Sequence, residues 1–321
     1  MEIRKLGSLD VSVLALGCNN FGARCDERES RTLVDTARNA GVTVFDTAAV
    51  YGGGRSEEML GAAIAPVRDE VVVVTKFGVP FGDDPDSGGT TAERVRRQAE
   101  ASLRRLGTDR IDLYLQHVPD PATPLDETLG ALADLVDAGK VVEAGCCNVD
   151  ASFVTEAIKL GAKGRGAQYV AVQNHYNLLQ RAAERDVLPL CEDSGLGFMP
   201  YFPLESGFLT GKYRRAKGFP EESRFAAASP ITQARIDSIT RPELYDRIEE
   251  LDSVARAHGS ALVDLALSWL ASRPAVACVP VGATTPQQIA ANAKAIAWEL
   301  PTGVADQVDQ IVEVGSDLIQ S

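Results

Sequence analysis

The sequence predicts an α/β protein, a (β/α)₈ barrel of the TIM type, and three observations predict it. Eight short apolar runs rich in β-branched residues recur along the chain, as expected for parallel strands buried on both faces. Amphipathic segments of helical length lie between them. The length of 321 residues suits one barrel with insertions, so we expect a single domain spanning residues 1–321.

The predicted strands are residues 11–17, 42–48, 70–78, 110–117, 140–148, 168–174, 196–203 and 275–282. We expect the polar segment before them, residues 1–10, to form an N-terminal β-hairpin that closes the barrel floor. An open doubly wound sheet is the alternative. That fold usually carries GxGxxG after its first strand. The nearest approach, residues 52–57, follows the second predicted strand and lacks the last glycine.

Helices are predicted over residues 29–41, 91–107 and 123–139, each of which closes with a glycine, a signal for a helix C-terminus. Asp150 has the residue type of an N-cap for a further helix. The stretch from about 205 to 240 is rich in Gly, Pro, Ser and charge. We interpret it as one long loop after strand seven, where barrel enzymes often grasp ligands.

The charge balance excludes one large class of partners. The 45 acidic residues exceed the 32 basic residues, which gives a net charge of −13. Nucleic-acid binding depends on many Lys and Arg contacts to phosphate, so we expect no nucleic-acid partner. The chain has no apolar run of membrane-spanning length and begins with no apolar stretch typical of a signal peptide, so we expect no membrane association.

The cysteines and histidines indicate neither disulfides nor a metal site. The six cysteines show no CxxC spacing and are interpreted as free thiols, which places the protein in a reducing compartment, the cytoplasm. The three histidines lie far apart without a zinc-binding pattern, so no metal is predicted.

Reactive side chains follow successive predicted strands. Asp46 ends the second strand, with Tyr51 on the loop beyond it, and Lys76 and His117 end the third and fourth. Because the carboxyl ends of barrel strands surround one mouth, we expect these four residues to converge there as the catalytic group. Amides follow at later strand ends, at Asn148 and Gln173.

This residue set favours protonation of an oxygen. A phenol has a pKa near 10, too high to release its proton readily at neutral pH. An ammonium beside Tyr51 would lower that pKa, and we expect Lys76 to supply it with Asp46 holding the ammonium in place. His117 would donate to a carbonyl oxygen. Since the set has no nucleophile with an adjacent base, hydrolysis is disfavoured.

Seven blocks of the sequence resemble the aldo-keto reductase family. They are FDTAAVYGGGRSEEMLG (45–61), VVVVTKFG (71–78), LYLQHVPDP (113–121), GCCNV (145–149), QNHYNLLQR (173–181), PYFPLESGFLTGKY (200–213) and VGATTPQQIAAN (281–292). The resemblance implies a (β/α)₈ barrel that binds NADP(H) in an extended pose without a Rossmann domain.

The resemblance assigns Tyr51 as the general acid, Asp46 and Lys76 as its tuning pair, and His117 as the residue that orients the substrate. It implies that Asn148 and Gln173 hold the nicotinamide carboxamide and that Tyr201 stacks on the nicotinamide ring. Further implied contacts to the cofactor are Pro203, Leu204, Gly207, Leu209, Gly211, Lys212, Arg224, Gly282, Thr284, Gln288 and Asn292.

Three residues depart from the family pattern. Cys147 replaces a common Ser, which weakens one cofactor hydrogen bond, and Phe202 replaces another in the pocket wall. Gln288 stands where many members place an Arg against the 2′-phosphate, and it brings no charge. NADP(H) is the predicted cofactor, with NAD(H) as the alternative.

The function predicted from the sequence is an oxidoreductase that reduces an aldehyde, ketone or sugar-like carbonyl to an alcohol. One alternative is a cofactor-binding regulatory subunit with little turnover, as in the potassium-channel β-subunit branch that the sequence also resembles. A second is a Schiff-base lyase that uses Lys76. The small-molecule substrate is not identified, and whether copies of the chain assemble into a homo-oligomer stays open.

Overall fold

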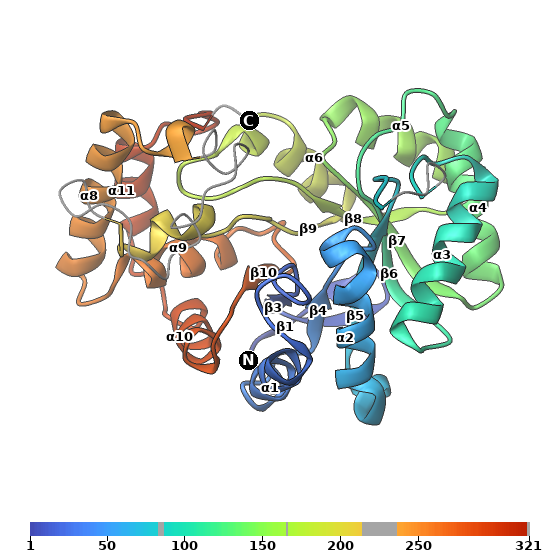
Figure 1. Cartoon of the computed structure of the whole chain (residues 1–321). Coiled ribbons are helices and arrows are strands. Elements are labelled where there is room, and N and C mark those ends of the chain that lie inside the picture. The colour runs from blue at the N-terminus through green and yellow to red at the C-terminus, as the bar shows by residue number, and fades with distance from the viewer. Residues whose placement is uncertain (83–86, 165, 214–235, 320–321) are drawn as a thin grey trace.

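Eight parallel strands form the sheet around which the described part of the chain is arranged (Figure 1). The structure, a computed structural model, describes residues 1–82, 87–164, 166–213 and 236–319. The strands are β3 (Leu14–Gly17), β4 (Val44–Asp46), β5 (Val72–Phe77), β6 (Ile111–Gln116), β7 (Val141–Cys147), β8 (Tyr169–Gln173), β9 (Gly197–Phe198) and β10 (Val279–Gly282). Their order in the sheet is β10-β3-β4-β5-β6-β7-β8-β9.

A parallel bridge between Phe198 and Val276 joins β9 to the segment before β10. The Phe198 N–H donates to the Ala275 carbonyl at 2.7 Å, and the Ala277 N–H donates back to the Phe198 carbonyl at 2.9 Å. These bonds connect the two edges of the sheet, so the fold is the predicted (β/α)₈ barrel rather than an open doubly wound sheet.

Each predicted strand contains an observed one, with three corrections at the boundaries. The run 196–203 is a strand only over Gly197–Phe198. The first run, 11–17, divides at Val13: its beginning belongs to a hairpin strand, and β3 starts at Leu14. The Ser12 hydroxyl explains the break, because it donates to the Leu14 carbonyl and accepts from the Thr43 N–H. The last strand begins at Val279 instead of 275, because Val276 before it pairs with Phe198 of β9.

The predicted N-terminal hairpin is present. Strands β1 (Ile3–Leu6) and β2 (Leu9–Ser12) pair antiparallel. Leu6 and Val11 are fully buried in one cluster with Val44 and Met199, which come from the barrel strand β4 and the end of β9. The hairpin therefore fills one end of the barrel interior and leaves the other end for the polar side chains.

Helices surround the sheet (Figure 1). They are α1 (Glu27–Asn39), α2 (Arg55–Ile64), α3 (Ala92–Leu106), α4 (Leu125–Asp137), α5 (Ala151–Ala162), α6 (Val187–Ser194), α8 (Pro242–Ala257), α9 (Leu262–Ala271), α10 (Pro286–Ile296) and α11 (Val304–Ile311). Short 3₁₀ turns are η1 (Tyr51–Gly54), η2 (Ala65–Glu70), η3 (Ala182–Glu184) and η4 (Glu205–Thr210).

The helix-end signals hold. Asp150 caps α5 by accepting the Phe153 N–H at 2.8 Å. Gly107 ends α3 in the left-handed conformation, whereas the glycines after α1 and α4 stand one residue beyond the caps Ala40 and Ala138. The predicted loop after strand seven begins with the short turn η4, in which Ser206 and Gly207 have non-helical backbone angles. Residues 214–235 of that loop lie outside the described residues.

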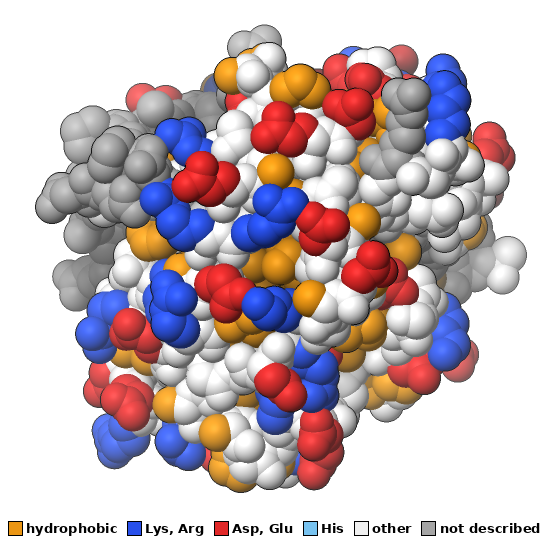
Figure 2. Space-filling model, turned by 90° about the vertical axis from the view of Figure 1, so that its right-hand side faces the viewer, with side chains coloured by type: hydrophobic (Ala, Val, Ile, Leu, Met, Phe, Trp, Pro, Cys, Tyr) orange, Lys and Arg blue, Asp and Glu red, His pale blue; other side chains and the backbone are white. Residues whose placement is uncertain are grey.

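The face of the molecule shown in Figure 2 carries acidic and basic side chains interspersed, without a field of one sign. Among the described residues, no helix is long and apolar enough to cross a membrane. All six cysteines are buried and free.

Candidate active site

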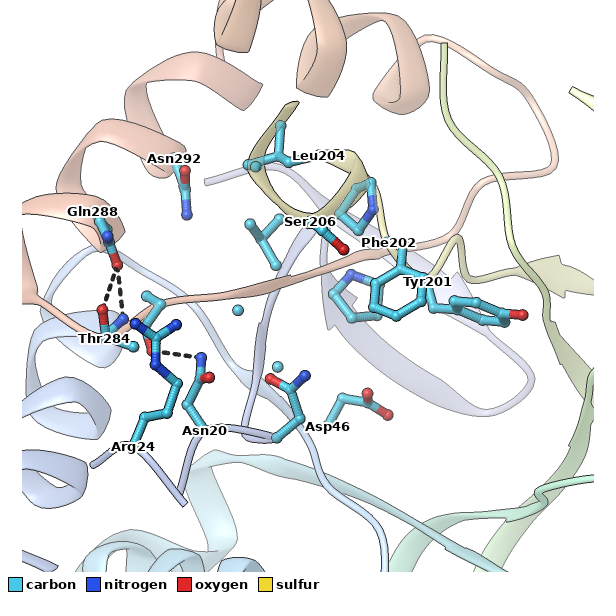
Figure 3. A pocket seen from close by; sticks show the side chains of 18 of the residues that line it. Asn20, Arg24, Asp46, Tyr201, Phe202, Leu204, Ser206, Thr284, Gln288 and Asn292 are labelled. Carbon is cyan, nitrogen blue, oxygen red and sulfur yellow. Dashed lines mark hydrogen bonds between the residues drawn. The ribbon is translucent and has the colours of Figure 1, made fainter. Parts of the chain in front are cut away.

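A pocket of about 500 Å³ opens beside the carboxyl ends of β3, β4, β8 and β10 (Figure 3). Asp46 and Gln173, the last residues of β4 and β8, line it together with Tyr51 and His117 from the loops that follow β4 and β6. This convergence is the one expected from the strand ends. At its other end the pocket reaches Gln288 and Asn292 on α10.

Lys76 and Asp46 form a buried ion pair at one end of this pocket. The Lys76 Nζ donates to Asp46 Oδ1 at 2.8 Å and to the Thr47 carbonyl at 2.7 Å. Lys76 is 1% exposed. Burial disfavours its charge, but Asp46 and Tyr51 outweigh that effect and raise the pKa of Lys76. The ammonium is therefore charged and fixed in direction.

Tyr51 lies directly beyond this pair. The Lys76 Nζ is 5.2 Å from the centre of the Tyr51 ring. Two left-handed glycines, Gly52 and Gly53, follow the tyrosine and turn the chain at once into α2. Burial raises the pKa of the Tyr51 phenol, and the charge of Lys76 lowers it by less. The expectation of a lowered Tyr51 pKa is thus wrong here, because enclosure outweighs the ammonium.

His117 completes the group. Its ring lies 6.2 Å from that of Tyr51, centre to centre, at an angle of 85°. Burial, aided by the charge of Lys76, lowers the pKa of His117 to about 3. The imidazole is therefore neutral at physiological pH and keeps one N–H to donate.

The amides at the later strand ends are engaged with this cluster. Gln173 Nε2 donates to Asp46 Oδ1 at 3.2 Å, while the Cys147 thiol lies 3.9 Å from Gln173 Oε1. Asn148 Nδ2 donates to the His117 carbonyl at 2.8 Å, and the Tyr201 hydroxyl donates to Asn148 Oδ1 at 2.7 Å. The two amides predicted to hold the nicotinamide thus lie directly against Asp46 and His117.

Tyr201 stacks on the imidazole of His175, with ring centres 5.3 Å apart and planes 15° from parallel. Behind it, the carboxylate of Glu205 is 0% exposed and lies 2.8 Å from both His175 Nε2 and Asn177 Nδ2. This buried pair of Glu205 and His175 joins the aromatic wall to the start of η4.

The segment around η4, residues 204–212, borders the middle of the pocket, and we call it the strap. Glu205, Ser206 and Gly207 all have positive φ, which tightens the turn. A Cβ on Gly207 would lie 3.1 Å from Lys212 Nζ. The missing side chain at 207 therefore leaves room for the lysine, whose charge is suited to a bound phosphate.

The far end of the pocket carries amides, hydroxyls and one cation. Gln288 Oε1 accepts from both the N–H and the hydroxyl of Thr284, at 2.7 and 3.2 Å. Asn20 Nδ2 donates to the Ala283 carbonyl at 3.2 Å. Arg24 stands beside these residues in Figure 3, far from Asp46.

Most of the residues predicted for the site meet in this one pocket. Those that line it are Asp46, Tyr51, His117, Asn148, Gln173, Tyr201, Pro203, Leu204, Gly207, Lys212, Gly282, Thr284, Gln288 and Asn292. Lys76 and Leu209 are buried behind it, and Gly211 is on the strap but not in the lining. Arg224 lies outside the described residues.

Sequence reasoning missed the contribution of the first barrel strand. Asn19, Asn20 and Arg24 follow β3 and line the pocket. The rule that found Asp46 and Lys76, inspection of the residues after each strand, would have found these. Ser206 was also absent from the predicted contacts, whereas Phe202 was expected in the pocket wall and lines the pocket.

No cluster of three or more potential metal ligands occurs among the residues that the structure describes. The pocket combines a phenol, a neutral imidazole and a fixed ion pair at one end with amides, hydroxyls and cations along the rest. A pocket at the carboxyl ends of barrel strands, lined by a few convergent polar groups, is typical of a binding or active site for a small molecule.

Comparison with known proteins identifies the family. The profile of the Aldo/keto reductase family matches residues 13–313, so the chain belongs to that family. It is 33% identical to a probable voltage-gated potassium channel subunit beta of Arabidopsis thaliana, covering 98% of this chain and 97% of the relative. An uncharacterized oxidoreductase of Bacillus subtilis, YrpG, is 32% identical over 97% and 96% of the two chains. An NADH-specific methylglyoxal reductase of Escherichia coli is 30% identical over 96% and 97%.

Proposed function

We propose that the protein is an NADP(H)-dependent oxidoreductase that reduces an aldehyde, a ketone or a sugar-like carbonyl to an alcohol, with Tyr51 as general acid. The observation that carries the proposal is the single pocket that joins Tyr51, the Lys76–Asp46 pair and neutral His117 to the strap and to α10. The residues fit a dinucleotide: amides at the catalytic end, Lys212 in the middle and Asn292 at the far end.

A reduced nicotinamide bound in this pocket would supply a hydride to the carbonyl carbon. His117 donates a hydrogen bond to the carbonyl oxygen and holds it beside Tyr51. Tyr51 transfers its phenolic proton to that oxygen as negative charge develops there. Lys76 then faces a phenolate, whose charge its ammonium stabilises, and Asp46 keeps the ammonium in position. Gln173 and Asn148 would hold the carboxamide of the nicotinamide.

Six free and buried cysteines favour a reducing compartment, and we propose the cytoplasm. We also propose that residues 1–321 act as one domain, because the hairpin, the strap and α10 all contribute to the same barrel.

The test uses purified protein and two steps. Protein fluorescence titrated with NADPH and with NADH gives both dissociation constants, and a panel of aldehydes, ketones and sugars is then assayed with the better cofactor. Oxidation of the reduced cofactor that depends on one panel member is the expected result. Absence of binding by either nucleotide would overturn the proposal.

A cofactor-binding regulatory subunit is the second candidate, because relatives from Arabidopsis thaliana and Oryza sativa are described as potassium channel β-subunits. Tight NADPH binding without turnover on any carbonyl, together with stable association with another protein, would favour it. A Schiff-base lyase is disfavoured, since Lys76 is buried, held by Asp46 and kept protonated. Borohydride trapping of a substrate on Lys76 would reverse that judgement.

A further inference from the structure

The loop between β3 and α1 places a cation at the end of the pocket that lies farthest from the acid–base group. Arg24 is exposed and lines the pocket beside Thr284 and Gln288 (Figure 3). Among the described residues, its guanidinium makes neither an ion pair nor a side-chain hydrogen bond. The cation is therefore available to a ligand.

The backbone that carries Arg24 is fixed. The Asn20 carbonyl accepts the N–H groups of residues 23, 24 and 25 at 3.2, 2.8 and 2.9 Å. The side chain of the same asparagine donates to Ala283, just before Thr284. One residue thus holds the Arg24 turn and ties it to the start of α10, so the position of the cation relative to Gln288 is set by the fold.

Gln288 lies at the same end of the pocket as Arg24 and presents a hydrogen-bond donor there. Its amide oxygen accepts twice from Thr284. Within the described part of the chain its amide nitrogen donates to no other group, which leaves N–H donors for a ligand. By contrast, the described lining of the whole pocket contains one acid, Asp46, which is paired with Lys76 at the opposite end.

The two nicotinamide cofactors differ at the adenosine ribose. In doubly wound dinucleotide-binding folds, a carboxylate accepts from the ribose 2′-hydroxyl of NAD, and an arginine accommodates the 2′-phosphate of NADP. The far end of this pocket offers a guanidinium and an amide N–H but no carboxylate among its described residues. An anionic phosphate gains both charge neutralisation and hydrogen bonds from these donors, whereas a hydroxyl gains hydrogen bonds alone.

We propose that Arg24 binds the 2′-phosphate of NADP(H) and makes the protein selective for NADP(H) over NAD(H), in place of the charge that Gln288 lacks. This inference rests on the proposed function. It assigns cofactor selectivity to a residue of the loop before α1, beside Gln288 but not on α10.

The experiment compares wild-type protein with Arg24→Gln and with Arg28→Gln, an exposed position on the first turn of α1 outside the pocket lining. Both variants remove one positive charge. Fluorescence titration with NADPH, NADH and adenosine 2′,5′-bisphosphate gives the affinities, and circular dichroism checks the fold. For Arg24→Gln we expect the dissociation constants of NADPH and of the bisphosphate to rise roughly 10- to 100-fold, with NADH unchanged. For Arg28→Gln we expect no change.

Equal weakening of NADPH and NADH in Arg24→Gln would overturn the inference and assign Arg24 to the pyrophosphate that both share. Unchanged binding of both would overturn it as well, as would a wild-type protein that binds NADH more tightly than NADPH. In the first two cases the proposed function survives unchanged. In the third, carbonyl reduction survives with NADH in place of NADPH. Absence of binding by wild-type protein would remove both.

Discussion

The two ends of the pocket handle charge in opposite ways. At the end proposed for catalysis, Lys76 and Asp46 are buried against each other, and each hydrogen-bonds a further group of the barrel. At the far end, Arg24 is exposed and unpaired within the described residues. A buried pair is already desolvated and oriented before any ligand arrives, as proton transfer requires. A hydrated cation becomes fully engaged only when an anion binds, which suits selection between two similar ligands.

If the two ends differ in this way, substitution of the proposed proton donor, Tyr51, should have the largest effect on turnover. Tyr51→Phe removes the hydroxyl and leaves the ring, so the packing against His117 is kept. We expect kcat on the best carbonyl to fall on the order of 10²- to 10⁴-fold. The dissociation constant for NADPH should stay within about twofold of wild type. Stopped-flow measurement of cofactor oxidation and titration give the two numbers. Unchanged turnover would remove Tyr51 as the acid.

A second large effect is expected for the buried pair. Lys76→Met leaves the Asp46 carboxylate without its partner, and we expect the free energy of unfolding to fall by about 3–5 kcal/mol together with the loss of turnover. The double variant Asp46→Asn with Lys76→Met removes both charges and should recover much of the stability but none of the activity. Urea denaturation measures the stabilities. A single variant as stable as wild type would contradict the assignment of a buried ion pair.

Substitutions in the buried Glu205–His175 pair, which joins the aromatic wall to the strap, should have a smaller effect. Glu205→Leu leaves the N–H donors of His175 and Asn177 without their acceptor, which costs about 1–3 kcal/mol in the free energy of unfolding. Because Tyr201 stacks on His175 and the strap begins at Glu205, NADPH should also bind a few-fold more weakly. Glu205→Gln keeps an acceptor oxygen and is the matched control. Equal stability and NADPH affinity in wild type, Glu205→Leu and Glu205→Gln would show that the Glu205–His175 pair neither stabilises the fold nor positions the strap.

The smallest effect concerns pH. Since the pKa of His117 is lowered to about 3, its imidazole stays neutral from pH 8 down to pH 5. The nuclear magnetic resonance signal of His117, assigned with His117→Gln, should show no titration in this range. The folded state then binds fewer protons than the unfolded state below pH 6.5. Wild-type protein should therefore lose stability as the pH falls from 6.5 toward 3, and His117→Gln should lose less. A titration midpoint of the His117 signal near pH 6.5 would contradict the lowered pKa.

The positions of the strand-end residues were predictable because parallel strands present their carboxyl ends on one side. That rule was enough to bring Asp46, Tyr51, Lys76 and His117 together. Arg24 was missed because the residues beyond the first predicted strand were not considered, although that strand was predicted to end correctly at Gly17.

Two further features require three-dimensional information. Glu205 and His175 are 30 positions apart, and no local pattern indicates that they meet. The direction of the Tyr51 pKa shift depends on how deeply the phenol is enclosed, which no spacing of residues reveals. Sequence patterns therefore predicted which groups gather, and the degree of burial decided how they ionise.

The N-terminal hairpin has a consequence for the kinetics. Leu6 and Val11 occupy the end of the barrel opposite the polar side chains, so ligands enter and leave by the same side. Of two molecules that share a single entrance, the one bound deeper has to arrive first and depart last. For the proposed reaction, binding and release would then follow a compulsory order.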